Sequence, residues 1–437
     1  MQAFRRFDVL ALGFMTFALF LGAGNLIVPP EIGRNAGADF WPATLGFLAT
    51  GVGLPLLGVV AVAVIGGGLR DLTQPLPRWA GIAYGLVIYL SIGPLFAIPR
   101  TATVAFEMGA APWLSNGDES AVALAVYTLI FFAVSTYLAL SPGKLMDRIG
   151  KYITPLLILV LAVMAIAVVL FPQGDIGQGS DKLNNGAFIF GFLQGYQTMD
   201  ALASVVFGIV IIQAIKDRGI TDRTLITRYV VLAGVIAAVC LSLVYVPLSW
   251  LGATCHEVAS QYNNGSHLIA LYITEIFGSA GQLILALIIT LACVTTAVGL
   301  LTSCGEYFHQ LMPSVSYRQF VIAMALVSAL LANQGLAQII QLSIPVLVAL
   351  YPLTMVLIAL SLLRPWLRDA NRVFSVAMAG TAVIAVYDGL NTAALAPEFL
   401  TSLYQQLPLA TEGMAWLCPA LLLIFVGLFF QRRMPNG

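Results

Sequence analysis

Long windows with almost no charged residue divide this sequence, and they decide what the chain can fold into. Each window supplies the ~20 apolar residues that a helix needs to cross the hydrocarbon core of a bilayer. Charged residues make up only 9% of the 437 residues, against roughly 25% in soluble domains. A fully wetted surface is therefore excluded, and the pattern predicts an all-α polytopic membrane protein. Twelve windows are found, near residues 8–30, 41–66, 79–99, 120–142, 152–173, 186–213, 229–254, 278–305, 319–334, 338–363, 373–393 and 412–431.

The N-terminal window allows a second interpretation. Arg5 and Arg6 precede an apolar run over 9–21 and then small residues, which is also the pattern of a cleaved signal peptide. Because eleven further spans follow, the first run needs no separate signal, and we interpret it as the first span.

The basic residues predict the orientation of these spans. Cytoplasmic loops are enriched in Lys and Arg. With the N-terminus inside, only Arg34, Arg100 and Lys182 of the 20 basic residues fall outside the cytoplasmic loops. We therefore predict a multi-pass protein of the plasma (inner) membrane with both termini cytoplasmic. The loops are too short to fold alone, so residues 1–437 are predicted to form a single transmembrane domain.

Two windows carry signs of an interruption. The first contains Gly22-Ala23-Gly24-Asn25, and the sixth contains Gly195-Tyr196-Gln197-Thr198-Met199-Asp200. Glycine favours unwinding in mid-membrane, although small residues also serve close helix packing. The sixth span comes five spans after the first, an odd offset, so matching spans would run in opposite directions. Interrupted helices at matching positions of inverted halves indicate a transport site near the midplane.

An unwound helix suits a zwitterionic substrate. Unwinding frees backbone N–H and C=O groups, which need partners inside a membrane. The N-termini of half-helices favour a carboxylate, and the opposing carbonyls favour an ammonium group and metal cations.

Three segments resemble the branched-chain amino acid:cation symporters, the LIVCS or BrnQ family. They are Phe17–Gly33, Ile98–Ala102 and Gly195–Ala203. The resemblance implies uptake of leucine, isoleucine and valine driven by sodium or protons. It also implies a LeuT-type 5+5 inverted repeat with helices 1 and 6 interrupted, made of residues 7–173 and 186–363. Two C-terminal helices, within 372–431, would follow.

The same resemblance implies a sodium site, since helix eight of LeuT-type symporters carries Ala-x-x-(Thr/Ser)-(Thr/Ser). This sequence has Ala292, Thr295 and Thr296 at those positions. The matching carbonyls of helix one are those of Ala18 and Leu21. The alternative is that both threonines bond back to their own helix, as hydroxyls often do.

A substrate pocket is expected around the two interruptions. The carboxylate is expected near the N–H groups of Gly22, Ala23, Gly24 and Asn25. The stretch from Gly195 through Tyr196 and Thr198 to Met199, together with Leu300, is expected to contact the rest of the amino acid. Because one methylene in an apolar pocket is worth only about 1–3 kcal/mol, discrimination among leucine, isoleucine and valine is expected to be weak.

Two charged residues are candidates for coupling or gating. Asp200 lies deep in the sixth window, where an acid is costly and usually functional; it is either a proton carrier or a cap for the following half-helix. Arg100 ends the third window and either snorkels to the outer face or lines the outer vestibule.

Other function classes find less support. An integral membrane enzyme would need a metal or acid–base cluster, and the three histidines, His256, His267 and His309, lack metal-ligand spacing. A channel would show a charge ring or filter repeat. A proton-coupled symporter for another small neutral amino acid remains an alternative. We expect no cofactor besides the coupling cation, no nucleic-acid partner because net charge is zero, and no obligate protein partner.

Overall fold

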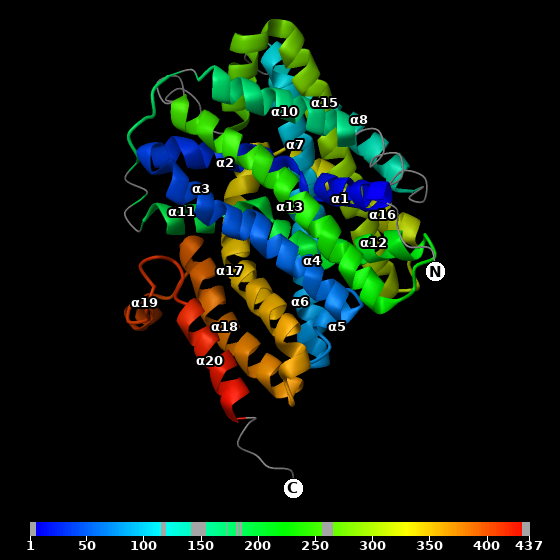
Figure 1. Cartoon of the computed structure of the whole chain (residues 1–437), viewed down its shortest axis with the longest axis vertical. Helices are drawn as coiled ribbons and strands as arrows, with labels where there is room; N and C mark the ends of the chain where they lie inside the picture. Colours follow the sequence, from blue (N-terminus) through cyan, green and yellow to red (C-terminus); the bar gives the residue numbers. More distant parts are fainter. Residues whose placement is uncertain are drawn as a thin grey trace.

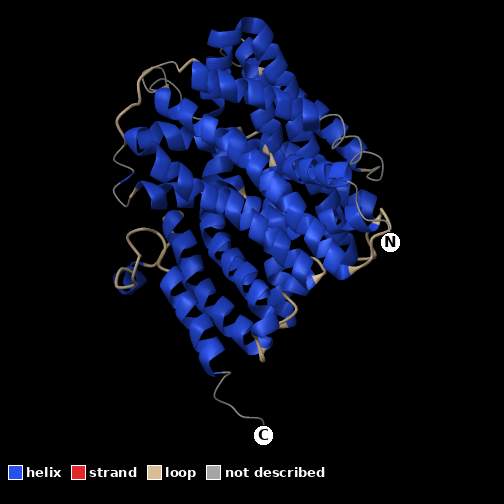
Figure 2. Cartoon of the chain, in the orientation of Figure 1, coloured by secondary structure: helices blue, strands red, loops and turns tan. Residues whose placement is uncertain are grey.

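The computed structural model describes residues 6–114, 119–140, 154–172, 174–180, 183, 186–255 and 265–430. Within these ranges the regular elements are helices (Figure 2). Each of the twelve windows predicted from the sequence contains a helical segment. The first five windows hold α1 (Arg6–Phe20), α2 (Ala23–Ala36), α3 (Phe40–Leu48), α4 (Leu54–Ile65), α6 (Arg78–Leu90), α7 (Ala97–Gly109), α8 (Glu119–Ala139) and α10 (Thr154–Leu170).

The remaining windows hold the second half of the chain. Their helices are α11 (Ala187–Gln194), α12 (Asp200–Lys216), α13 (Arg223–Thr254), α15 (Gly265–Leu311), α16 (Tyr317–Ala332), α17 (Leu336–Leu363), α18 (Ala370–Thr392) and α20 (Leu417–Phe430). Short helices connect them, among which are α5 (Leu69–Leu72) and α19 (Glu398–Tyr404).

Not every helix is long enough to span a membrane by itself. In the described part of the chain, seven helices have the length and hydropathy of a span, and the bent pair Ala187–Thr198 and Asp200–Lys216 passes the same test as one unit. Shorter apolar helices cover Phe7–Phe20, Thr154–Leu170, Tyr317–Ala332 and Leu417–Leu428. All-helical spanning architecture is thus established, whereas twelve crossings remain a prediction.

The first span is interrupted where the sequence predicts it. α1 ends at Phe20 and α2 begins at Ala23, with Gly22 in an extended conformation. The N–H group of Gly22 donates to the carbonyl of Phe20 at 2.7 Å. It therefore turns away from the carbonyl of Ala18, which a continuous helix would have satisfied.

The sixth span is also interrupted at the predicted place. α11 tightens into a 3-10 turn over Gly195–Thr198, and α12 then leaves at 47°. Met199, at the corner, has φ 64° and ψ 8°, the left-handed region that a side chain rarely adopts. Such local strain persists where surrounding packing enforces it, and it concentrates at functional sites.

The third span has a break that was not predicted from the sequence. A π-turn over Ser91–Leu95 separates α6 from α7, and Gly93 leaves the helical region with φ −89° and ψ −123°. Pro94 lacks an N–H group and cannot continue the hydrogen-bond ladder. α15 also breaks, at Gly278 with φ 63°, so residues 265–277 form a short helix within the predicted loop.

Each interrupted span packs on an early span of the other half. α1 and α2 contact α13, which crosses the molecule beside them (Figure 1). In the same way α11 contacts α3, and α12 contacts α4. The backbones touch at these crossings: a Cβ built on Gly252 would lie 1.9 Å from the carbonyl oxygen of Pro30, and one on Gly191 would lie 1.8 Å from that of Ala43.

The C-terminal helices lie along one edge of the molecule. α18 packs between α17 and α20, and α19 projects beyond them (Figure 1). None of the three contributes to the interrupted spans. Several of the basic residues that predict the orientation lie outside the described residues, namely Arg5, Lys144, Arg148, Lys151, Lys182, Arg432 and Arg433.

Candidate functional site

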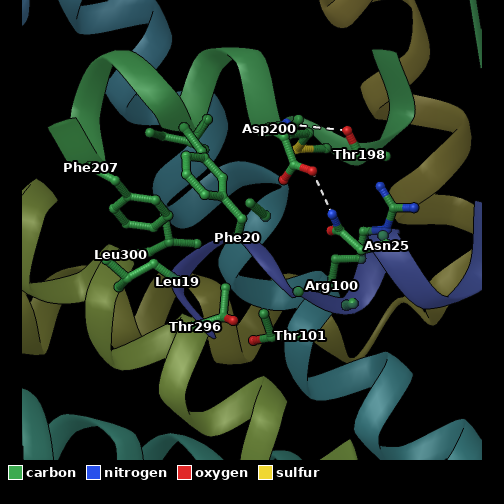
Figure 3. A pocket seen from close by; sticks show the side chains of 17 residues that line it. Leu19, Phe20, Asn25, Arg100, Thr101, Thr198, Asp200, Phe207, Thr296 and Leu300 are labelled. Atoms are coloured by element: carbon green, nitrogen blue, oxygen red, sulfur yellow. Dashed lines mark hydrogen bonds between the residues drawn. The ribbon is translucent and has the colours of Figure 1, made fainter. Parts of the chain in front are cut away.

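A cavity lies where the two interruptions meet. Its walls come from the ends of α1 and α2, from α7 and α12, and from α15 (Figure 3). Its volume is about 40 Å³, far below the roughly 300 Å³ or more of typical small-molecule pockets. A branched amino acid needs more room, so the lining side chains must move apart to admit one. Predicted residues that line it are Gly22, Ala23, Gly24, Asn25, Arg100, Thr198, Met199, Asp200, Thr296 and Leu300.

The cavity is polar at one end and apolar at the other. Asp200, Thr198, Asn25 and Arg100 gather on one side, while Leu19, Phe20, Phe207 and Leu300 gather on the other (Figure 3). The aromatic rings of Phe20 and Phe207 meet edge to face, with centroids 5.9 Å apart. A ligand that is charged at one end and aliphatic at the other matches this division.

Asp200 belongs to a buried network between helices. Its Oδ2 accepts a hydrogen bond of 2.5 Å from the amide of Asn25, which also donates to the hydroxyl of Tyr245. Asp200 is the first residue of α12, where a negative charge also suits the helix dipole. Its own N–H group donates to the hydroxyl of Thr198 at 3.3 Å, so the choice between a cap and a proton carrier remains a prediction.

Arg100 does not snorkel to the outer face. Its side chain is only 3% exposed, and its Nη1 donates to the carbonyl of Gln197 at 2.5 Å. The snorkelling alternative is therefore wrong, whereas the alternative that Arg100 lines a vestibule stays a prediction; α7 follows the kink at Gly93 and brings Arg100 to the interrupted part of the sixth span. Nε and Nη2 of Arg100 are buried without a hydrogen-bond partner.

Two predicted substrate residues lie behind the cavity wall. The ring of Tyr196 stacks on that of Tyr351 with centroids 4.4 Å apart, and it is not part of the lining. Gly195 is pressed against the second span, since a Cβ there would lie 2.0 Å from the hydroxyl of Thr50. These residues support the unwound segment, whereas Thr198 and Met199 face the cavity.

The predicted sodium residues lie at the junction of α1 and α15. The hydroxyl of Thr296 donates to the carbonyl of Leu21, in the break between α1 and α2, at 3.3 Å. The hydroxyl of Thr295 donates to the carbonyl of Ala292 in its own helix at 2.8 Å, which is the local bond of the alternative interpretation. Of this set only Thr296 reaches the cavity, and Ala18, Leu21, Ala292 and Thr295 lie behind it.

Sequence reasoning missed part of the lining. Phe207 lies two turns into α12, Ala97 and Thr101 flank Arg100 on α7, and Tyr245 joins the Asp200 network from α13. Only Gly93-Pro94 gave a signal, because that pair marks the kink that positions α7.

A larger cavity of about 490 Å³ lies between α5, α6 and the end of α15. Its lining includes Arg70, Arg78 and Tyr307 but no residue from either interrupted span. The smaller cavity therefore remains the candidate site.

Comparison with known proteins gives consistent matches over the whole chain. The model of a family described as branched-chain amino acid transport protein matches residues 5–434. The chain is 52% identical to the branched-chain amino acid transport system 2 carrier protein of Pseudomonas aeruginosa, over 99% of this chain and 98% of that protein. It is 44% identical to the branched-chain amino acid permease BrnQ of Escherichia coli K12, over 97% and 96% of the two chains.

Two solved structures share the fold at low sequence identity. Mhp1, a nucleobase-cation-symport-1 family transporter, superposes with a TM-score of 0.63 at 15% identity, over 97% of this chain and 92% of that one. MhsT, solved in complex with L-phenylalanine, gives 0.56 at 17% identity, over 98% and 99% of the two chains. At such identities the likeness establishes the fold alone.

Proposed function

This chain belongs to the family of branched-chain amino acid transport proteins, and from that premise we propose that it imports leucine, isoleucine and valine by cation symport. It is a transporter and not an enzyme. The observation that carries the substrate proposal is the division of the cavity between the two helix breaks into a charged end and an apolar end. The substrate's carboxylate and ammonium groups occupy the first, and its branched side chain lies between Phe20, Phe207 and Leu300.

Sodium is the coupling ion that we favour. It binds between α1 and α15, held by the carbonyls of Ala18, Leu21 and Ala292 and the hydroxyls of Thr295 and Thr296. The Thr296–Leu21 hydrogen bond and the turning of the Gly22 N–H group away from Ala18 support this assignment. A hard cation prefers several such oxygen ligands. Proton coupling through Asp200 is the alternative, which the buried position of that carboxyl favours.

The chain works by alternating access between two inverted halves, residues 7–173 and 186–363. The reciprocal packing of α1 and α2 on α13, and of α11 and α12 on α3 and α4, supports this symmetry. Helices α18 and α20 lie outside it. The protein sits in the plasma (inner) membrane with cytoplasmic termini.

Uptake of labelled leucine into proteoliposomes of the purified protein tests the proposal. We expect accumulation above equilibrium when an inward sodium gradient is imposed. Accumulation with an inward proton gradient alone would transfer the coupling role to Asp200. Absence of accumulation with either gradient, in protein shown to be folded, would refute symport of branched-chain amino acids.

A further inference from the structure

Arg100 is the most unusual charged group in the structure. It is buried in the membrane domain, lines the cavity, and keeps two of its three guanidinium nitrogens without a protein partner. Arginine does not lose its proton in proteins. Leaving donors of a buried charged group without hydrogen bonds is costly, so the two open nitrogens call for an acceptor, and an anion suits the positive charge.

The acids near Arg100 leave two of its donors unused. Glu31 and Asp200 act on it electrostatically, but Nε and Nη2 donate a hydrogen bond to neither of them. Glu31 accepts the N–H group of Gly265 at 3.1 Å, and Asp200 accepts the amide of Asn25.

The direction of the free donors is also informative. Nη1 is used by the carbonyl of Gln197, which leaves Nε and Nη2, the adjacent pair of the guanidinium fork. That pair matches the two oxygens of a carboxylate with parallel hydrogen bonds.

A second positive group converges on the same place. α2, fourteen residues long, starts at Ala23, and its N-terminus favours negative charge. A Cβ built on Gly24 would lie 3.3 Å from Cζ of Arg100, so the guanidinium lies directly against the first turn of α2. A side chain at position 24 would require its neighbours to shift.

We propose that Arg100 binds the α-carboxylate of the transported amino acid through Nε and Nη2, together with the N-terminal N–H groups of α2. This inference rests on the proposed function and adds a side-chain anchor to a site otherwise made of backbone groups. The substrate's ammonium group then faces Asp200, across the polar end of the cavity. Through Gln197 the same arginine connects the bound carboxylate to the unwound segment of the sixth span.

A cycle of variants and ligands tests the proposal. Competition against labelled leucine is measured for leucine and for leucinol, which keeps the ammonium group and side chain but replaces the carboxylate with an alcohol. We expect Arg100→Gln to weaken the binding of leucine by about 10- to 100-fold, the usual effect of losing a charged hydrogen-bond partner. The affinity for leucinol should stay almost unchanged. Arg34→Gln, outside the cavity, is the matched control and should change neither.

The outcomes separate this inference from the function beneath it. If the binding of leucine and that of leucinol weaken equally, the carboxylate assignment is wrong. The role of Arg100 would then be to hold the unwound segment through the carbonyl of Gln197. Failure of the unmodified protein to bind leucine would instead refute the proposed substrate. If Arg100→Gln does not fold, Arg100→Lys decides: it keeps the charge but loses the fork, so the preference for leucine over leucinol should fall, and an unchanged preference contradicts the proposal.

Discussion

The two adjacent threonines of α15 make different hydrogen bonds. Thr295 bonds within its own helix, whereas Thr296 reaches the carbonyl of Leu21 across the helix interface. Removing the Thr296 hydroxyl deletes a proposed sodium ligand from the contact between α1 and α15. We expect Thr296→Ala to raise the sodium concentration for half-maximal leucine uptake at least about tenfold, the effect of losing ~1.4 kcal/mol of binding, while Thr296→Ser retains it.

Ser303 offers a control on the same helix, because its hydroxyl bonds only to the carbonyl of Gly299, at 2.8 Å. Ser303→Ala should leave the sodium dependence of uptake as it is. If Thr296→Ala and Ser303→Ala behave alike, the proposed sodium site is wrong.

Asp200 carries a different prediction, because its carboxylate bonds to Asn25 and not to its own helix. A proton carrier at this position requires that Asp200→Asn flatten the pH dependence of uptake. A partner for the substrate's ammonium group requires a higher KM for leucine with the pH profile unchanged. Uptake measured between pH 5.5 and 8.5 at saturating sodium distinguishes the two roles. A variant with unaltered KM and pH profile would exclude both.

The sequence motifs identified the residues at the two helix interruptions. They identified few of the residues on the helices that face the interruptions. Gly22, Asn25 and Met199 lie in segments whose composition breaks a helix, so their position near a site could be predicted. Phe207 and Tyr245 sit in uninterrupted apolar helices, where nothing in the local sequence distinguishes a cavity-facing ring from one that packs. Arg100 was expected near the outer face because it ends an apolar window, and the window does not reveal that the kink at Gly93 directs α7 to the cavity.

The close packing of two helices depends on glycine where their backbones touch. At the crossing of α2 and α13, Gly33 faces the carbonyl of Ser249 and Gly252 faces that of Pro30, with Cβ clearances of 1.7 and 1.9 Å. Backbone atoms cannot rotate away as a side chain does. We expect Gly252→Ala to force the helices apart and to destabilise the protein by at least the about 1–3 kcal/mol typical of overpacking, seen as a lower Tm in detergent.

Gly53→Ala is the control for this measurement. Its backbone is helical, with φ −63° and ψ −47°, and the nearest atom to an added Cβ lies at 3.7 Å. A Tm that falls no further in Gly252→Ala than in Gly53→Ala would show that the crossing tolerates a side chain, contrary to the structure.

The positions of the helices could be predicted from the sequence more accurately than the breaks within them. Charge-free windows locate the spans because burial in lipid excludes charge along their length. The break at Gly278 coincides with the start of the eighth predicted window, which begins at residue 278. The interruption of α15 depends on its left-handed backbone, φ 63°, which composition does not reveal.

The whole molecule requires an even number of crossings if both termini are cytoplasmic. The critical element is α16, whose 16 residues span about 24 Å at 1.5 Å per residue, less than the ~30 Å hydrocarbon core. A short helix can still cross where the bilayer thins around it. If α16 did not cross, the segment 333–335 would be cytoplasmic and α17 would run in the opposite direction.

Reporter fusions resolve this point. We expect alkaline phosphatase to be active after Ile176 and after Gln334, and green fluorescent protein to fluoresce after Gly219, Ser314 and Arg368. The reason is that Arg318, Arg364, Arg368 and Arg372 flank α16 and α17 on the side that positive charge assigns to the cytoplasm. Inactive phosphatase after Gln334 with active phosphatase after Arg368 would mean that α16 does not cross. The second half would then lack the antiparallel relation to the first on which alternating access between inverted repeats depends.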